Sequence, residues 1–283
     1  MKSGLGWAAQ LWRLLALLLL SAVVLQLVFA LRIGLMTLVD PQSTAFQRSE
    51  AWRLLTEQGR ILWSQDWVAD DRLSNHLKRA VIASEDAGFA DHSGVEWDAI
   101  EKAWERNQRA EERAARAARR QPERAPQPKI VGGSTITQQL AKNLLLSGER
   151  TVLRKAQELV LTLMLETLLD KPRILEIYLN NVEWGEGVFG AQAAARHYFR
   201  VDAARLSPLQ AARLAVMLPA PKRFEKRPGS AYVAGRAATI VARTDPGSEP
   251  VMTLSAKHGV LVRSYHVRAK FRPMGNGPVV AMA

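Results

Sequence analysis

The fold class is decided by residues 132–172, GGSTITQQLAKNLLLSGERTVLRKAQELVLTLMLETLLDKP. Two glycines lead into a predicted helix over residues 134–146, in which Thr135 and Gln138 have the S/T-x-x-Q spacing of a capping box. A strongly apolar second helix is predicted over residues 153–169, where a Lys-Pro pair ends it. Two successive helices without an alternating strand between them predict a mainly α fold.

Helical patterns continue on both sides of this stretch. Residues 45–65 predict an amphipathic helix or a pair of helices, and further helices are predicted at residues 73–86, 173–180, 191–199 and 207–217. We find no convincing alternating strand before Val251. The literal GxGxxG at residues 185–190 follows a predicted helix rather than a strand, so we expect these glycines to permit a tight turn and not to bind a dinucleotide.

The N-terminal segment predicts a membrane anchor. Residues 14–31, LLALLLLSAVVLQLVFAL, contain no charge and one amide, Gln26, and would form about 27 Å of helix. No small-x-small cleavage site follows, which favours an uncleaved span over a signal peptide. Lys2 and Arg13 precede the span, which favours a cytoplasmic segment at residues 1–13 with the rest of the chain outside. We expect the span to supply local concentration rather than chemistry.

Composition excludes several classes of protein. The 283 residues carry a net charge of +12, 48% are hydrophobic and none is cysteine, which excludes a disordered or fibrous chain, disulfides, a thiol nucleophile and cysteine-ligated metals. Residues 106–129 and 244–283 carry +5 and +3, together +8 of the +12. We therefore expect a solvated arm or loop at 106–129 and a basic tail with short β-like stretches at 244–283, rather than a domain that coats nucleic acid.

One predicted helix places a carboxylate on its apolar stripe. Leu77, Val81 and Glu85 are spaced i, i+4, i+8, so Glu85 should face inward. Desolvation there raises the pKa of its carboxyl and makes it a usable general base. The alternative is that Glu85 and Asp86 form an ordinary acidic pair on the surface. His92, seven residues past Glu85, fits either a positioning hydrogen bond or an exposed loop.

Four cations occur within fourteen residues, at Lys142, Arg150, Arg154 and Lys155. Together with the free N–H groups of a nearby helix N-terminus, such a group could hold a diphosphate. The GxxxxGK[ST] spacing is missing, which excludes a nucleotide P-loop. The alternative for Arg154 is a surface salt bridge with Glu158, four residues on.

Five motifs in order along the chain resemble those of family 51 glycosyltransferases: ASEDAGFADHSGVEWDAI (83–100), GGSTITQQLAKN (132–143), RKAQE (154–158), ILEIYLNNVEWGEGVFGAQAAARHYF (174–199) and LQAARLAVMLPAPKRF (209–224). The resemblance implies a mainly α, lysozyme-like glycosyltransferase domain at residues 45–243, with the basic insert at 106–129 and an unassigned tail at 244–283. The insert is longer than the linker usual between the first two motifs. The SxxK, SDN and KTG motifs are missing, so no transpeptidase domain is expected.

The resemblance implies that the protein polymerises lipid II into glycan strands for cell wall synthesis, with inversion at the anomeric carbon and release of undecaprenyl diphosphate. Glu85 would take the proton from the 4-hydroxyl of the acceptor sugar, and Glu158 would be the second catalytic glutamate. The remaining motif positions would bind substrate or shape the site: Asp86, Phe89, His92, Ser134, Thr135, Gln138, Gln139, Lys142, Asn143, Arg150, Arg154 and Lys155.

The resemblance also implies a setting for this reaction. A divalent cation, Mg²⁺ or Mn²⁺, would assist at the diphosphate, and no organic cofactor is expected. The expected partners are lipid II, the growing glycan chain, the lipid bilayer and proteins of cell wall synthesis or division, but not nucleic acid. We expect a single-pass protein of the bacterial cytoplasmic (inner) membrane with its catalytic domain on the periplasmic or extracytoplasmic side.

Two other functions fit parts of the sequence. A lytic muramidase would also use a catalytic glutamate in a lysozyme-like fold, although hydrolysis does not call for four cations around a leaving group. A non-catalytic anchored scaffold, with its basic segments binding anionic lipid or nucleic acid, would leave all five motifs unexplained. The sequence favours the polymerase.

Overall fold

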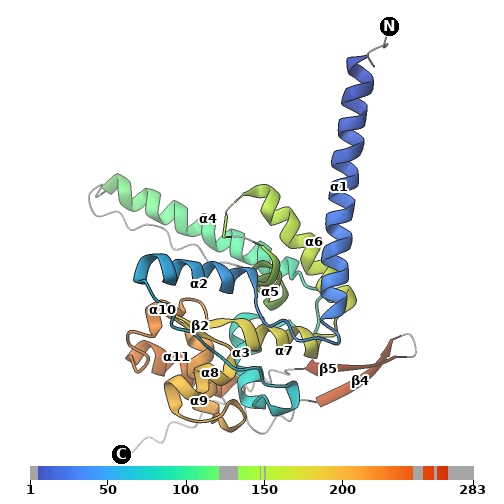
Figure 1. Cartoon of the computed structure of the whole chain (residues 1–283). Helices are drawn as coiled ribbons and strands as arrows, with labels where there is room; N and C mark the ends of the chain where they lie inside the picture. The colour runs from blue at the N-terminus through green and yellow to red at the C-terminus, as the bar shows by residue number, and fades with distance from the viewer. Residues whose placement is uncertain are drawn as a thin grey trace, which may run out of the picture.

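The computed structural model describes residues 6–120, 133–146, 148–149, 151–244, 251–257 and 260–266. Most of these residues are helical, which confirms the predicted fold class (Figure 1). The α-helices are α1 (Trp7–Leu35), α2 (Ala45–Gln58), α3 (Asn75–Glu85), α4 (Trp97–Arg120), α5 (Ile136–Leu145), α6 (Val152–Leu168), α7 (Lys171–Asn181), α8 (Ala191–Phe199), α9 (Pro208–Met217), α10 (Pro221–Phe224) and α11 (Ala231–Arg243). The strands are β1 (Ser64–Gln65), β2 (Glu183–Gly185), β3 (Val188–Phe189), β4 (Val251–Lys257) and β5 (Val260–His266).

The predicted helices agree with α3 and with α5 to α9 to within a few residues at each end. The helical prediction for residues 45–65 is wrong beyond residue 58, because Gly59 ends α2 in the left-handed conformation with φ +67°. Helix α11 lies in a stretch for which the sequence predicted no element. In the tail, β4 and β5 form an antiparallel hairpin, which agrees with the β-like stretches expected there.

Helix α1 extends away from the core and carries the predicted span (Figure 1). Its residues Ala9–Leu35 are long and apolar enough to cross a membrane, and most of their side chains are exposed. The base of the helix is different, because Ile33 and Met36 are buried in the core. Arg173 of α7 donates a hydrogen bond from Nε to the Met36 carbonyl over 2.7 Å. The apolar rod is therefore fixed to the core at its C-terminal end.

Helix α7 is buried along most of its length. Asp170 caps its N-terminus by accepting a hydrogen bond from the Arg173 amide over 2.9 Å, and Pro172 occupies the first turn. Residues 174–181 are all buried, so neighbouring segments cover α7 on every side rather than along one stripe. Because α7 is packed on all sides, a side chain that it contributes to a functional site is held in a fixed position.

A small sheet has the strand order β1-β3-β2. Strands β2 and β3 form an antiparallel hairpin, and β1 pairs with β3 in parallel. Gly187 turns the hairpin with φ +72°, and a Cβ atom there would lie 2.0 Å from the Leu62 carbonyl oxygen. The prediction of a tight turn in the GxGxxG segment is confirmed. The prediction of no strand before Val251 is wrong, because strands of two or three residues are too short to show alternation.

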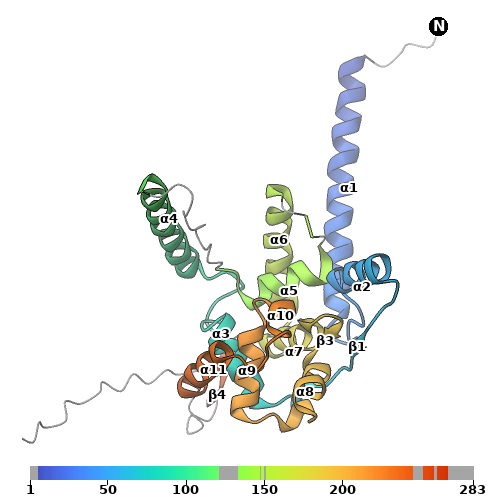
Figure 2. The same ribbon diagram turned by 90° about the vertical axis from the view of Figure 1, so that its left-hand side faces the viewer.

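Helix α4 corrects the expectation of a basic arm or loop. Residues 106–120 continue the helix that begins at Trp97, whereas residues 121–129 lie outside the described residues. Alanine, arginine and glutamate favour helix, and exposed pairs such as Arg109 with Glu105, at 3.1 Å, add i, i+4 support. Helix α4 extends from the core on the same side as α1 and α6 (Figure 2).

Replacing residues 109–129 with a short Gly/Ser linker should preserve cooperative folding, because the described side chains of α4 beyond Ala103 are mostly exposed. We expect the free energy of unfolding, measured by urea titration in detergent, to change by less than about 1 kcal/mol. Ala103→Asp, at the buried start of the same helix, is the positive control and should cost more than about 2 kcal/mol. Loss of cooperative unfolding in the linker variant would place the insert in the core.

Candidate active site

Glu85 ends α3 and its carboxylate is half-buried, as the helical stripe predicts. Gln139 of α5 donates a hydrogen bond from Nε2 to Glu85 Oε2 over 3.1 Å. Burial raises the pKa of the Glu85 carboxyl above its usual value, the Gln139 hydrogen bond opposes the rise, and the neighbouring Asp86 charge adds to it. This combination gives a carboxylate that can accept a proton and that is held in place by an amide.

Tyr178 of α7 orients that amide. Its hydroxyl donates to Gln139 Oε1 over 3.0 Å, so the NH₂ group of Gln139 is directed at Glu85. Burial keeps the pKa of Tyr178 well above its usual value, and the phenol stays protonated as a donor. The sequence did not reveal Tyr178 as a site residue, because its position on the core helix α7 looks like ordinary packing.

Asp86 connects α3 to α5. Its side chain is 1% exposed and accepts two hydrogen bonds, from the Ile136 amide to Oδ2 over 2.9 Å and from His92 Nε2 to Oδ1 over 2.8 Å. His92 Nδ1 in turn accepts from the Gly94 amide over 3.0 Å, so the proton of the neutral ring lies on Nε2. The geometry favours a positioning role for Asp86 and His92 over the predicted contact with substrate.

One group of carboxylate and imidazole side chains among the described residues has the spacing of a metal site. The ligand atoms of Asp86, His92 and Glu96 lie within 4.8 Å of one another. Both ring nitrogens of His92 and both carboxylate oxygens of Asp86 are already hydrogen-bonded within the protein. This group therefore does not fit a resident cation, and we assign it no metal.

The predicted capping box at the N-terminus of α5 is present. Thr135 Oγ1 accepts from the Gln138 amide over 3.2 Å, and Gln138 Oε1 accepts from the Thr135 amide over 3.1 Å. Thr135 Oγ1 also donates to the Gly94 carbonyl over 2.6 Å. Both side chains are buried, so they hold the helix N-terminus in place. Of the other predicted site residues, Ser134 is exposed and Phe89 is buried in the core.

Glu158 lies on α6, with its side chain 4% exposed. It forms ion pairs with Arg154, at 3.3 Å, and with Lys155, which confirms the predicted Arg154–Glu158 pair and adds a second cation. Arg154 Nε is buried and has no hydrogen-bond partner in the described part of the chain. A buried donor of this kind is suited to an anionic acceptor.

The remaining predicted binding residues surround the α5–α6 connection. Lys142 is exposed and Asn143 half-buried near the C-terminus of α5, whereas Arg150 lies outside the described residues. The predicted site residues that the structure describes thus fall into two groups. One lies around Glu85 and Gln139, and the other lies around Arg154 and Glu158. Their substrate contacts stay predictions.

Asp86→Ala should destabilise the fold, because it leaves the buried Ile136 amide and His92 Nε2 without their charged acceptor. We expect the free energy of unfolding to fall by about 2–3 kcal/mol in a urea titration. Glu101→Ala, which removes an exposed carboxylate on α4, is the control and should change it by less than about 0.5 kcal/mol. Equal stabilities of the two variants would contradict the connecting role of Asp86.

Comparison with known proteins shows the family of the chain. Residues 56–245 match the transglycosylase family. Curated proteins named biosynthetic peptidoglycan transglycosylase are 53% identical in Burkholderia pseudomallei and 52% in Burkholderia thailandensis, in each case over 225 residues that cover 80% of this chain and 82% of the relative. The protein of that name in Paraburkholderia phytofirmans is 50% identical over 220 residues, covering 77% and 85%. The chain belongs to the transglycosylase family.

Proposed function

We propose that this transglycosylase is a peptidoglycan glycosyltransferase that polymerises lipid II into glycan strands and releases undecaprenyl diphosphate. The observation that carries the proposal is the half-buried Glu85 carboxylate, whose pKa is raised by burial and whose Oε2 is held by Gln139. A carboxylate with a raised pKa binds a proton more tightly and is a stronger base than an exposed one. The names of the curated relatives support the same substrate class.

In the proposed step, Glu85 accepts the proton of the acceptor sugar's 4-hydroxyl. That oxygen attacks the anomeric carbon of the growing chain from the face opposite the lipid, a new carbon–oxygen bond forms, and the bond to the diphosphate oxygen breaks with its electron pair. The configuration at the anomeric carbon is thereby inverted. Gln139 and Tyr178 fix the base in position before the substrate arrives, which lowers the reorganisation needed in the transition state.

The leaving group becomes more negative in this step. Arg154 and Lys155 of α6, which we call the cationic cluster, offer the compensating positive charge. Arg154 and Lys155 would bind the diphosphate, with Lys142 and Arg150 as further candidates. Glu158 pairs with both α6 cations and would keep their side chains directed at the phosphates. Mg²⁺ or Mn²⁺ would accompany the diphosphate as its counter-ion, and no step depends on it.

The proposed setting follows from α1. The span would lie in the bacterial cytoplasmic (inner) membrane, with residues 1–13 in the cytoplasm and the catalytic domain on the periplasmic side, where lipid II is presented. The bilayer is then a partner of the protein, and proteins of cell wall synthesis or division are further proposed partners. A muramidase would share the glutamate, but it would have no use for a buried arginine donor near a leaving group.

Glu85→Gln should leave folding intact and lower polymerisation of lipid II at least about 10²-fold, because it removes the base while keeping the shape of the side chain. The rate is measured from the glycan products of purified protein on a gel. Glu101→Gln, on the exposed surface of α4, is the matched control and should retain full activity. Near-normal turnover by a well-folded Glu85→Gln protein would contradict the assignment. Degradation of polymeric peptidoglycan by the wild type would favour the muramidase.

A further inference from the structure

The single amide in the apolar span has a partner on another helix. Gln26 Nε2 of α1 donates to Gln157 Oε1 of α6 over 2.9 Å, and Gln157 Nε2 donates back to Gln26 Oε1 over 3.0 Å. Each amide therefore gives one hydrogen bond to the other and accepts one from it. The two residues are 131 positions apart in the sequence, so this is a tertiary contact between the anchor and the folded domain.

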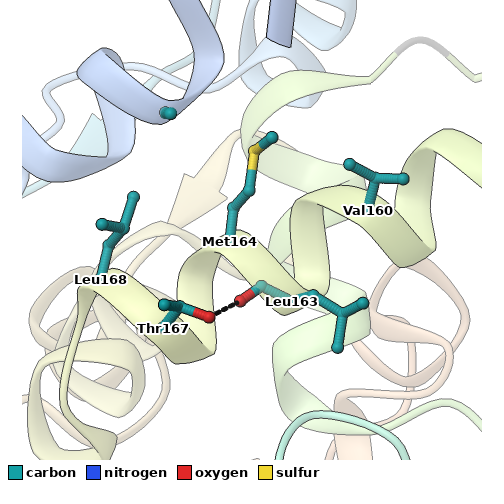
Figure 3. A pocket seen from close by; sticks show the side chains of 6 residues that line it. Val160, Leu163, Met164, Thr167 and Leu168 are labelled. Carbon is teal, nitrogen blue, oxygen red and sulfur yellow. Dashed lines mark hydrogen bonds between the residues drawn. The ribbon is translucent and has the colours of Figure 1, made fainter. Parts of the chain in front are cut away.

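An apolar groove lies about one turn beyond this pair, at Ala30 of α1 and Val160 of α6. The groove has a volume of about 350 Å³ and is lined by Ala30, Val160, Leu163, Met164, Thr167 and Leu168. Figure 3 shows how the side chains from α6 line it. Its one hydroxyl, Thr167 Oγ1, donates within α6 to the Leu163 carbonyl over 2.7 Å. Leu163 is 48% and Leu168 40% exposed, so α6 presents a hydrophobic surface beside the span. This surface suits the hydrocarbon of a bilayer and not water.

In such surroundings the amide pair specifies one arrangement of the two helices. An unpaired amide in hydrocarbon is costly because no water replaces the lost hydrogen bonds, whereas packing of leucine against lipid is nearly neutral. Rotation of α6 about its axis, or a slide along α1, would break both hydrogen bonds of the pair. Helix α1 is held a second time at Ile33 and Met36, about two turns further on, so its direction is fixed as well.

We propose that Gln26 and Gln157 are positioning residues that dock the membrane helix on α6 and so set the orientation of the cationic cluster. Gln157 directly precedes Glu158, and Arg154 lies one turn earlier on the same helix. The pair thereby gives the span a role in the chemistry besides local concentration. This proposal rests on the proposed function, because it assigns the cluster to the diphosphate of the lipid substrate.

The docking itself is tested without activity. The chain contains no cysteine, so Ala30→Cys with Met164→Cys introduces the only thiol pair and leaves both glutamines in place; both residues line the groove beside α6. In native membranes a short bismaleimide should join these thiols and close a large loop visible as a gel shift. Gln10→Cys with Met164→Cys is the matched control; Gln10 is about 30 Å further along α1 than Ala30 and should give little or no product. Equal yields from the two pairs would overturn the docking.

The positioning role is tested by a double-mutant cycle in liposomes that contain lipid II. Gln26→Leu and Gln157→Leu should each lower kcat about tenfold with little change in KM, and the double variant should be no worse than either single variant, because the two residues act as one unit. Gln10→Leu, which replaces an exposed glutamine of the same helix, should leave kcat unchanged.

Three results separate the possible failures. Independent, multiplying effects of the two leucine variants, or unchanged kcat in both, would overturn the positioning role even if the cross-link forms. A wild-type protein that folds but makes no glycan, together with a dicysteine variant that still cross-links, would instead contradict the proposed function. If the leucine variants lower the thermal unfolding midpoint without changing kcat, the pair is a structural contact only, and the positioning role is contradicted.

Discussion

The arrangement of the site depends on one buried carboxylate. Asp86 accepts hydrogen bonds from the first amide of α5 and from His92, and this joins the C-terminal end of α3 to the N-terminal end of α5. A carboxylate at a helix N-terminus is favoured by the helix dipole as well as by the hydrogen bonds. Because Glu85 is the adjacent residue, the same junction places the proposed base opposite Gln139.

Each further feature of the site extends that junction. The capping box of Thr135 and Gln138 satisfies the amides of these two residues at the start of α5, and Tyr178 fixes the amide of Gln139 from the buried helix α7. Helix α5 is linked to α6 by Thr137, which donates to Glu166 over 2.6 Å. The base and the cationic cluster therefore sit on helices that are joined by hydrogen bonds between polar side chains as well as by apolar packing.

The sequence predicted the helices, the capping box and the inward-facing Glu85, because these follow from periodicity and local spacing within one segment. It did not predict Tyr178 or the Gln26–Gln157 pair, since both are contacts between residues far apart in the chain that carry no local signal. The arm at residues 106–120 was expected to be solvated, and its side chains are mostly exposed over residues 106–117; it is nevertheless helical, because alanine, arginine and glutamate favour helix even without a core to pack on. Asp86 and His92 were predicted to bind substrate or to shape the site, and their hydrogen bonds in the junction fit the second of these roles.

The central claim is that burial raises the pKa of Glu85 and that Gln139 limits this rise. It is tested most directly by the pH dependence of kcat/KM on lipid II for the wild type and for Gln139→Leu. Because loss of the Gln139 hydrogen bond disfavours the ionised carboxylate, the account predicts an acidic limb above the ordinary glutamate pKa of 4.5 in the wild type, and a limb at still higher pH in the variant. An acidic limb at the ordinary value, or a shift to lower pH in Gln139→Leu, would contradict the account.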